Sequence, residues 1–130
     1  MLIITIRTDK PESEIGLYDD RTQLGYETWA AHRQLAETIH LKLEALLRVH
    51  GKDWQDIGGL VCFQGPGSFT GLRIGLTVAN ALSYSYHVPV VAMQDPNWLE
   101  IGITRLLAGE SDHLALPFYG ADAHITPPKK

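Results

Sequence analysis

The chain has 130 residues, of which 45% are hydrophobic and 20% charged, and its formal net charge is −4 at pH 7. This length suits one domain that buries about two-thirds of its unfolded surface, and the composition excludes a disordered chain. Autonomous binding of nucleic acid is not expected, because phosphate neutralisation needs clustered Lys and Arg. The lone Cys62 excludes a disulfide framework, and no apolar run reaches membrane-spanning length. We therefore expect a cytoplasmic protein with no membrane segment.

Three short strands are predicted in the first thirty residues. They cover Leu2 to Thr8, Ile15 to Tyr18 and Gln23 to Trp29, and turn-forming residues separate them. Links this short join antiparallel neighbours, so the pattern predicts a meander.

From about His32 to His50 the hydrophobic period becomes helical. The stripe expected to face the core consists of Leu35, Ile39, Leu43, Leu46 and Leu47. A second stripe, at four-residue spacing, contains Leu41, Ala45 and Val49. This helix is therefore predicted to bury two faces.

The rest of the pattern alternates strands with helices. The predicted elements are a strand at Leu60–Phe63, a helix at Gly71–Tyr86, a strand at Val88–Met93 and a helix from Asp95 or Asn97 to about Ala108. The helix after Gly71 is apolar on two faces. One face contains Leu72, Leu76, Ala79 and Tyr86, and the opposite one contains Ile74, Val78, Ala81 and Leu82. A sheet can cover only one of them.

The order β-β-β-α-β-α-β-α predicts an α/β fold in which helices pack on a mixed sheet, resembling ribonuclease-H-like and actin-like ATPase lobes. We expect one lobe over residues 1–109. Residues 110–130 contain several prolines and no periodicity, and they are predicted to form an extended tail.

A glycine loop joins the strand that ends at Phe63 to the following helix. Its residues are Gly65, Pro66, Gly67, Ser68, Phe69, Thr70 and Gly71. A strand that turns sharply into a helix is where α/β proteins bind anions, but neither the Walker A pattern nor the dinucleotide spacing is present. Two interpretations stay open: a phosphate cradle, and a tight turn that positions the helix.

No catalytic group and no metal site is predicted. The six histidines include no pair at a helical ligand spacing of three or four, and no His-Glu-x-x-His motif occurs. Ser68 is not in a nucleophile elbow, because the motif needs glycine where this chain has Thr70. We therefore expect a chain that is not an enzyme and has no cofactor of its own.

The run from Gly65 to Gly75 resembles the signature of the TsaB (YeaZ) family, and the meander, the Leu-rich helix that begins with His32 and the run Val88–Val91 agree with it. The resemblance implies an actin-like ATPase fold without catalysis. It also implies a TsaD homologue as partner, a TsaE-like ATPase that joins through the complex, and tRNA as an indirect partner, in the synthesis of threonylcarbamoyladenosine. ATP or ADP and Mg²⁺ are implied only in the assembled complex.

In family complexes the first two helices of each partner form a shared helical bundle, which implies a use for the second apolar stripes. The implied partner-binding residues are His32, Leu41, Ala45, Val49, Arg73, Ile74, Val78 and Leu82. Two alternatives stay open: a homodimer formed by the same helices, and a small nucleotide-binding enzyme that uses the glycine loop.

The chain departs from the family pattern in two places. Where the family reads Ile-Asp-Thr-Ser, this chain has Ile6-Arg7-Thr8-Asp9, so a cation replaces the acid that actin-like folds place near Mg²⁺ and phosphate. Nucleotide chemistry is therefore not expected. The third helix is also followed almost at once by Leu116–Tyr119, which resembles the end of family sequences, so we expect that most of the second lobe has been deleted.

Overall fold

The computed structural model describes residues 1–67 and 69–118, apart from the side chains of residues 32 and 69. The strands are β1 (Leu2–Arg7), β2 (Glu12–Asp19), β3 (Thr22–Ala30), β4 (Ile57–Phe63) and β5 (Val90–Met93). The helices are α1 (Leu35–Val49), α2 (Phe69–Tyr86) and α3 (Trp98–Leu107), with short 3-10 turns η1 (His32–Gln34) and η2 (Trp54–Asp56). The predicted order of elements is confirmed.

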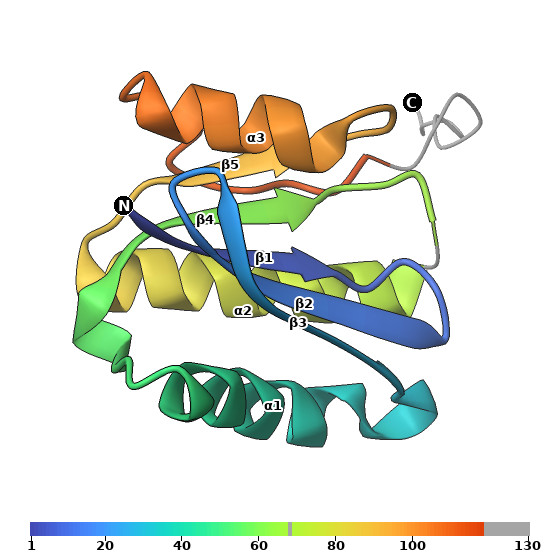
Figure 1. Cartoon of the computed structure of the whole chain (residues 1–130). Coiled ribbons are helices and arrows are strands. Elements are labelled where there is room, and N and C mark those ends of the chain that lie inside the picture. The colour runs from blue at the N-terminus through green and yellow to red at the C-terminus, as the bar shows by residue number, and fades with distance from the viewer. Residues whose placement is uncertain (68, 119–130) are drawn as a thin grey trace, which may run out of the picture.

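The five strands form one mixed sheet in the order β3-β2-β1-β4-β5. The first three pair antiparallel, as the meander predicted, while β4 pairs parallel with both β1 and β5. Helices α1 and α2 cover one face of the sheet and α3 covers part of the other (Figure 1). The α/β fold class is therefore confirmed.

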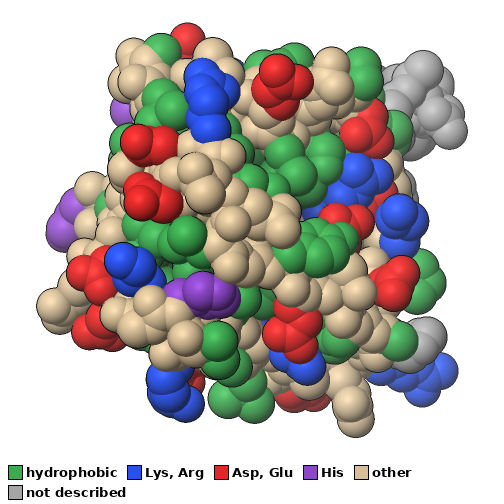
Figure 2. Space-filling model, in the orientation of Figure 1, with side chains coloured by type: hydrophobic (Ala, Val, Ile, Leu, Met, Phe, Trp, Pro, Cys, Tyr) green, Lys and Arg blue, Asp and Glu red, His purple; other side chains and the backbone are tan. Residues whose placement is uncertain are grey.

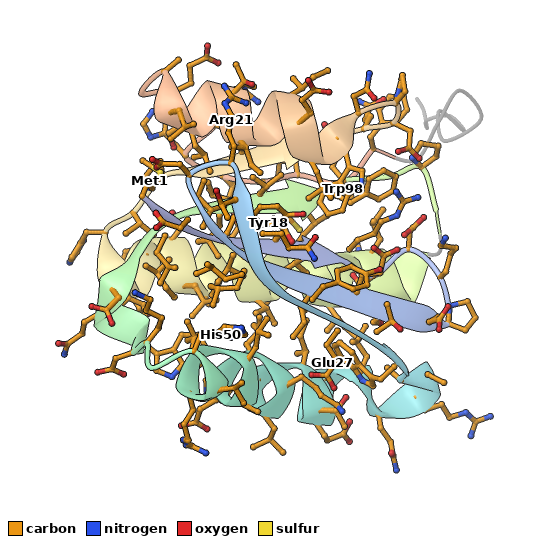
Figure 3. All side chains as sticks on the ribbon, viewed as in Figure 1. Met1, Tyr18, Arg21, Glu27, His50 and Trp98 are labelled. Carbon is orange, nitrogen blue, oxygen red and sulfur yellow. The ribbon has the colours of Figure 1, made fainter. Side chains whose placement is uncertain are left out.

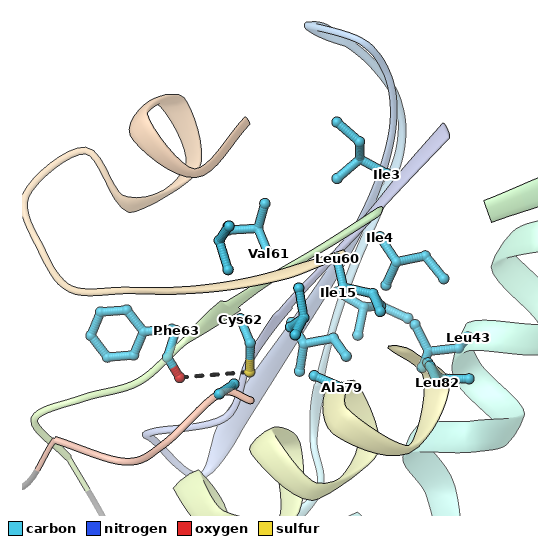
Figure 4. Close-up of a cluster of buried hydrophobic side chains, with 14 of the residues drawn as sticks. Ile3, Ile4, Ile15, Leu43, Leu60, Val61, Cys62, Phe63, Ala79 and Leu82 are labelled. Atoms are coloured by element: carbon cyan, nitrogen blue, oxygen red, sulfur yellow. Dashed lines mark hydrogen bonds between the residues drawn. The ribbon is translucent and has the colours of Figure 1, made fainter. Parts of the chain in front are cut away.

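The core lies mainly between the sheet and the pair α1 and α2. Ile4 of β1 and Ile15 of β2 lie on the side of Leu43 of α1 and Ala79 of α2, and all four side chains are buried (Figure 4). Cys62 is 1% exposed in this layer, and its Sγ is 3.8 Å from the carbonyl oxygen of Phe63. Burial raises the pKa of the Cys62 thiol, so it acts as a small apolar side chain.

A smaller contact layer joins α3 to the other face of the sheet. Trp98 packs edge-on against Phe63 with ring centroids 5.8 Å apart. Arg21, in the β2–β3 turn, donates a hydrogen bond to the hydroxyl of Thr104 at 3.0 Å. Figure 3 shows Trp98 between α3 and the sheet and Arg21 reaching α3. Both contacts attach α3 to a sheet that it covers only in part.

Residues 111–118 run along the outer edge of β5. The Asp112 N–H donates to the carbonyl of Val90 at 2.8 Å, and the Asp112 carboxylate accepts from the N–H of Ala92 at 2.8 Å. Ala115 and the side chain of Asn80 exchange two hydrogen bonds of 2.7 and 2.9 Å. This stretch of the predicted tail therefore covers a sheet edge, while residues 119–130 lie outside the described part of the chain.

Candidate functional site

The glycine loop packs tightly against its neighbours. Gly65 has φ = +116°, and a Cβ atom there would collide with the backbone carbonyl of Phe118. A Cβ atom on Gly67 would collide with Asp9. The Thr8 hydroxyl also donates to the carbonyl of Gly71 at 2.7 Å. These contacts favour the interpretation of the loop as a tight turn that positions α2.

The loop residues differ in exposure. Gly65 is buried, Pro66, Gly67 and Thr70 are exposed, and Gly71 is half-buried. Ser68 and the side chain of Phe69 lie outside the described residues. Among the described residues, only part of the loop is therefore accessible to water.

Arg7 lies at the carboxyl end of β1, between two carboxylates. Its Nε and Nη2 donate to Asp9 at 2.9 and 3.2 Å, and its Nη1 and Nη2 donate to Asp95 at 3.3 and 3.2 Å. Its guanidinium carbon also lies 3.8 Å from the centroid of the Phe63 ring. Planar, bidentate contacts of this kind are the strong form of ion pair, and the ring adds a cation–π contact.

Arg7 and Asp9 are largely shielded from water, with side chains 14% and 8% exposed. Burial by itself would lower the pKa of Arg7, but the hydrogen bonds to Asp9 and Asp95 raise it above the ordinary value. Arg7 therefore stays charged at neutral pH.

This end of the sheet does not fit the magnesium nucleotide that an actin-like fold implies. The position expected to carry an acid holds a guanidinium, and that guanidinium is already paired with both nearby carboxylates. Among residues 1–67 and 69–118, no cluster of three or more His, Cys, Asp or Glu could hold a metal ion.

The outer face of α1 is apolar and open to water. Leu41 is 62% exposed and Val49 is 78% exposed, and Ala45 between them is also exposed. The predicted core stripe of the same helix is buried throughout. The division of α1 into a core stripe and a second apolar stripe is therefore confirmed. Exposed aliphatic side chains at this spacing are suited to covering by another protein.

Part of α2 forms a groove with α1. The groove has a volume of about 250 Å³ and is lined by Ala36 of α1 together with Arg73, Ile74, Thr77 and Val78 of α2. Ile74 and Val78 are half-buried, with part of each side chain packed on the core. The groove is therefore shallow and has an aliphatic floor.

Leu82, which was predicted to bind a partner together with Ile74 and Val78, is not on the exposed surface of α2. Leu82 is only 8% exposed and lies in the core cluster near Leu43 (Figure 4). The helix carries apolar residues all round, so its sequence does not define which face meets the sheet. The helical spacing grouped Tyr86 with Leu72, Leu76 and Ala79; those three are buried, but Tyr86 is 36% exposed.

The remaining predicted partner-binding residues form two separate areas. Leu41, Ala45 and Val49 do not line the groove that contains Arg73, Ile74 and Val78. Glu44 and Arg48 of α1 pair with each other at 3.4 Å on the outer surface of the helix. His32 lies in η1, and its side chain is outside the described residues.

A stack of three aromatic rings was not predicted from the sequence. The ring centroids of His40 and Trp54 are 5.0 Å apart, and those of Trp54 and Tyr86 are 6.2 Å apart, with nearly parallel planes. The rings come from α1, η2 and the end of α2. The sequence offers only the isolated Trp54 as a signal, because no periodic pattern links these three elements.

Known proteins share this sequence pattern. The family model described as TsaD, tRNA N6-adenosine threonylcarbamoyltransferase, matches residues 28–100, which is over half of the chain. The TsaB protein of Escherichia coli K12, a tRNA threonylcarbamoyladenosine biosynthesis protein, is 30% identical over 83% of this chain and 49% of its own length. A tRNA N6-adenosine threonylcarbamoyltransferase of Geotalea uraniireducens is 30% identical over 73% of this chain and 28% of its own length.

Solved structures agree on the fold. YeaZ from Pseudomonas aeruginosa superposes with a TM-score of 0.67 at 23% identity, over 72% of this chain and 44% of that one. RuvC from Thermus thermophilus superposes with a TM-score of 0.52 at 15% identity, over 95% of this chain and 89% of that one. Both neighbours support an actin-like and ribonuclease-H-like lobe.

The chain belongs to the TsaD-like family, because the model of that family matches residues 28–100. Within it, the glycine-loop signature and the similarity to TsaB and YeaZ place the chain in the TsaB (YeaZ) family. The chain spans about half the length of the TsaB relative from Escherichia coli.

Proposed function

We propose that this chain is a non-catalytic scaffold that binds a TsaD homologue through α1 and α2 and supports threonylcarbamoyladenosine synthesis in this way. The similarity to both TsaB and tRNA N6-adenosine threonylcarbamoyltransferases supports a partner of the TsaD type. We place this activity in the cytoplasm, because a lone buried thiol suits a reducing compartment. No described helix combines the length and hydrophobicity needed to cross a membrane.

The observation that carries this proposal is the apolar surface of α1. Leu41 and Val49 expose 62% and 78% of their area to water, and the groove with Ile74 and Val78 lies on the other side of the same helix. Covering such side chains yields roughly 25 cal/mol for each Å² of apolar area buried. The free energy gained on docking would keep the partner in its active arrangement.

Two further observations favour docking over chemistry or direct binding of RNA. Arg7 and its two carboxylate partners fill the end of β1, where nucleotide chemistry would need an accessible acid. Acidic and basic side chains are intermixed on the face shown in Figure 2, so this face offers no basic patch for phosphate groups. A TsaE-like ATPase and tRNA would then join through the complex, with ATP and Mg²⁺ held by other subunits.

Leu41→Glu and Val49→Glu test the proposal most directly, because both side chains are exposed and neither supports the core. Each variant should bind a TsaD homologue from the same genome about 30-fold more weakly, since an apolar anchor lost from an interface costs about 2 kcal/mol. Pull-down and titration calorimetry measure the loss, and a threonylcarbamoylation assay should decline with it.

Ile101→Glu is the matched control, because Ile101 is a 44% exposed aliphatic residue on α3, across the sheet from α1. Binding by this variant should equal that of the wild type. If the α1 variants bind and support modification as well as the control does, the proposed interface is wrong.

Two other outcomes identify the alternative functions. A wild-type chain that sediments as a dimer, and loses dimerisation with Leu41→Glu, would make the same face a homodimer interface. Tight binding of ATP and Mg²⁺ with turnover by the isolated chain would support a small nucleotide-binding enzyme and overturn the scaffold proposal.

A further inference from the structure

Helices α1 and α2 begin at the same end of the sheet (Figure 1), and residues near both starts line a second pocket. Its volume is about 430 Å³. Lys10 and Pro11 line it from the β1–β2 turn, Arg33 from η1 and Leu35 from the start of α1, and Gly71 and Ile74 from the start of α2. Three separate segments therefore build this pocket.

The charged side chains that line this pocket are both positive. Lys10 and Arg33 are exposed, and no acidic side chain is among the described residues that line the pocket. The neighbouring Asp9 is held by Arg7 and is only 8% exposed. The pocket is therefore locally cationic in a chain whose net charge is −4. The first turn of α2 adds to the positive potential.

The pocket continues into the groove between the helices. Ile74 lines both, and beyond it the groove floor is formed by Ala36 and Val78. Farther along the same helices, the ring of Trp54 lies between those of His40 and Tyr86. The space between α1 and α2 thus has a cationic end, an aliphatic middle and an aromatic end.

We infer that the pocket receives a carboxylate side chain of the partner protein, carried on a helix whose apolar residues cover Ile74 and Val78. Charge complementarity selects an acidic group, and the aliphatic floor that continues from the pocket favours a protein segment over a free anion. This inference rests on the proposed docking of a TsaD homologue. It adds the orientation of the partner, whose acidic residue lies at the end where α1 and α2 begin.

The test compares three full-length proteins in binding to the TsaD homologue at low and high salt. Lys10→Glu combined with Arg33→Glu should weaken binding about 30-fold at 50 mM salt and only a few-fold at 300 mM, because screening removes the repulsion. The control, Arg21→Glu combined with Lys52→Glu, changes net charge equally at exposed positions outside the pocket, and it should stay within about threefold of the wild type. Circular dichroism verifies that all three fold.

A rescue experiment identifies the partner group. Each acidic residue in the first two helices of the TsaD homologue is changed to Lys, and one such variant should bind the Lys10→Glu, Arg33→Glu protein at least tenfold better than the wild-type partner does. Absence of rescue at every position overturns the inference. Unchanged binding by the double variant also overturns it, while the proposed function stands if Leu41→Glu still weakens binding. A wild-type chain that binds no TsaD homologue overturns both.

Inorganic phosphate distinguishes a free anion from a side chain. The expected result is no saturable binding of phosphate to the isolated chain below 10 mM. Submillimolar binding that is lost in the double variant, together with a complex whose affinity is the same for both proteins, would assign the pocket to a small anion and overturn the inference.

Discussion

The carboxyl end of β1 and the outer face of α1 differ in which side chains they expose to water. The first shields charged side chains, and the second exposes apolar ones. At β1, Arg7 is withdrawn from water and paired with Asp9 and Asp95 against the Phe63 ring. On α1, Leu41 and Val49 lie mostly in water. A ligand site keeps charged groups accessible, whereas a docking surface keeps apolar ones accessible. The contrast favours the proposed docking of a protein on α1 and a stabilising role for the ion pairs at the end of β1.

Removal of Arg7 should give the largest effect on stability. Arg7→Ala leaves Asp9 buried without its partner, and breaking a buried pair in this way costs about 3 kcal/mol of unfolding free energy. Urea unfolding followed by circular dichroism measures the change. Arg21→Ala is the control, because Arg21 is exposed and makes one hydrogen bond, so it should cost about 0.5 kcal/mol or less. Equal costs for the two variants would contradict a structural role for the Arg7 cluster.

Gly65→Ala should be nearly as costly. The φ of +116° disfavours any side chain, and the added Cβ atom would meet the Phe118 carbonyl, so we expect a loss of about 2 to 3 kcal/mol. Gly51→Ala provides the comparison, because its φ is +68° and no atom lies within 4 Å of the added Cβ. That variant should lose about 1 kcal/mol. A smaller loss at position 65 than at 51 would show that the loop is open to a ligand.

The stability of the fold should depend on pH through Asp112, which bonds to the edge strand β5. A hydrogen bond from Arg105 at 2.5 Å lowers the pKa of Asp112, burial opposes the shift, and the N–H of Ala92 adds to it. Because the folded pKa lies below the unfolded value, Asp112 stabilises the fold above about pH 4 and loses this effect as the pH falls through the folded pKa.

Asp112→Asn tests this expectation. It should cost about 1.5 kcal/mol at pH 7, since charge-assisted hydrogen bonds are lost, and the difference from the wild type should shrink as the pH falls to about 2. Urea unfolding at the two pH values measures it. A difference that stays the same at both would exclude the carboxylate charge as the cause.

The α1 surface should give the smallest effect on stability. Leu41→Glu changes a side chain that is exposed in the isolated chain, so the unfolding free energy should change by about 0.5 kcal/mol or less. Thermal unfolding of the isolated chain measures it, next to Leu43→Ala at a fully buried position, which should lose about 3 kcal/mol. A large loss in Leu41→Glu would mean that this stripe supports the fold and would remove the contrast with β1.

The hydrophobic periodicity and the turn-forming residues of the sequence were enough to predict most of the fold. The 3.6-residue period of α1 separated its core stripe from Leu41 and Val49, because each stripe occupies its own side of the helix. Boundaries were less accurate. Strand β2 extends to Glu12 and Asp19, since polar residues such as Glu14 face outward and bond Tyr26 across the pair. Val88 bonds back to Ser83 and ends α2 instead of starting β5.

The candidate site depends on contacts that no local pattern contains. Arg7 was singled out by its position, but its partner Asp95 lies 88 residues away, and only the parallel packing of β1, β4 and β5 joins them. Leu82 was misplaced because α2 is apolar on every side. The pocket that contains Lys10 and Arg33 forms only when two helix starts and a strand turn meet.

The burial of Cys62 allows its thiol to report when the hydrophobic core opens to solvent. It is the only cysteine, it is 1% exposed, and its raised pKa leaves almost no thiolate at neutral pH. Alkylating reagents can therefore reach the sulfur only when the core around β4 opens. The rate at which a maleimide labels the native chain would time that event, and a second cysteine placed on the surface could carry a dye without competition.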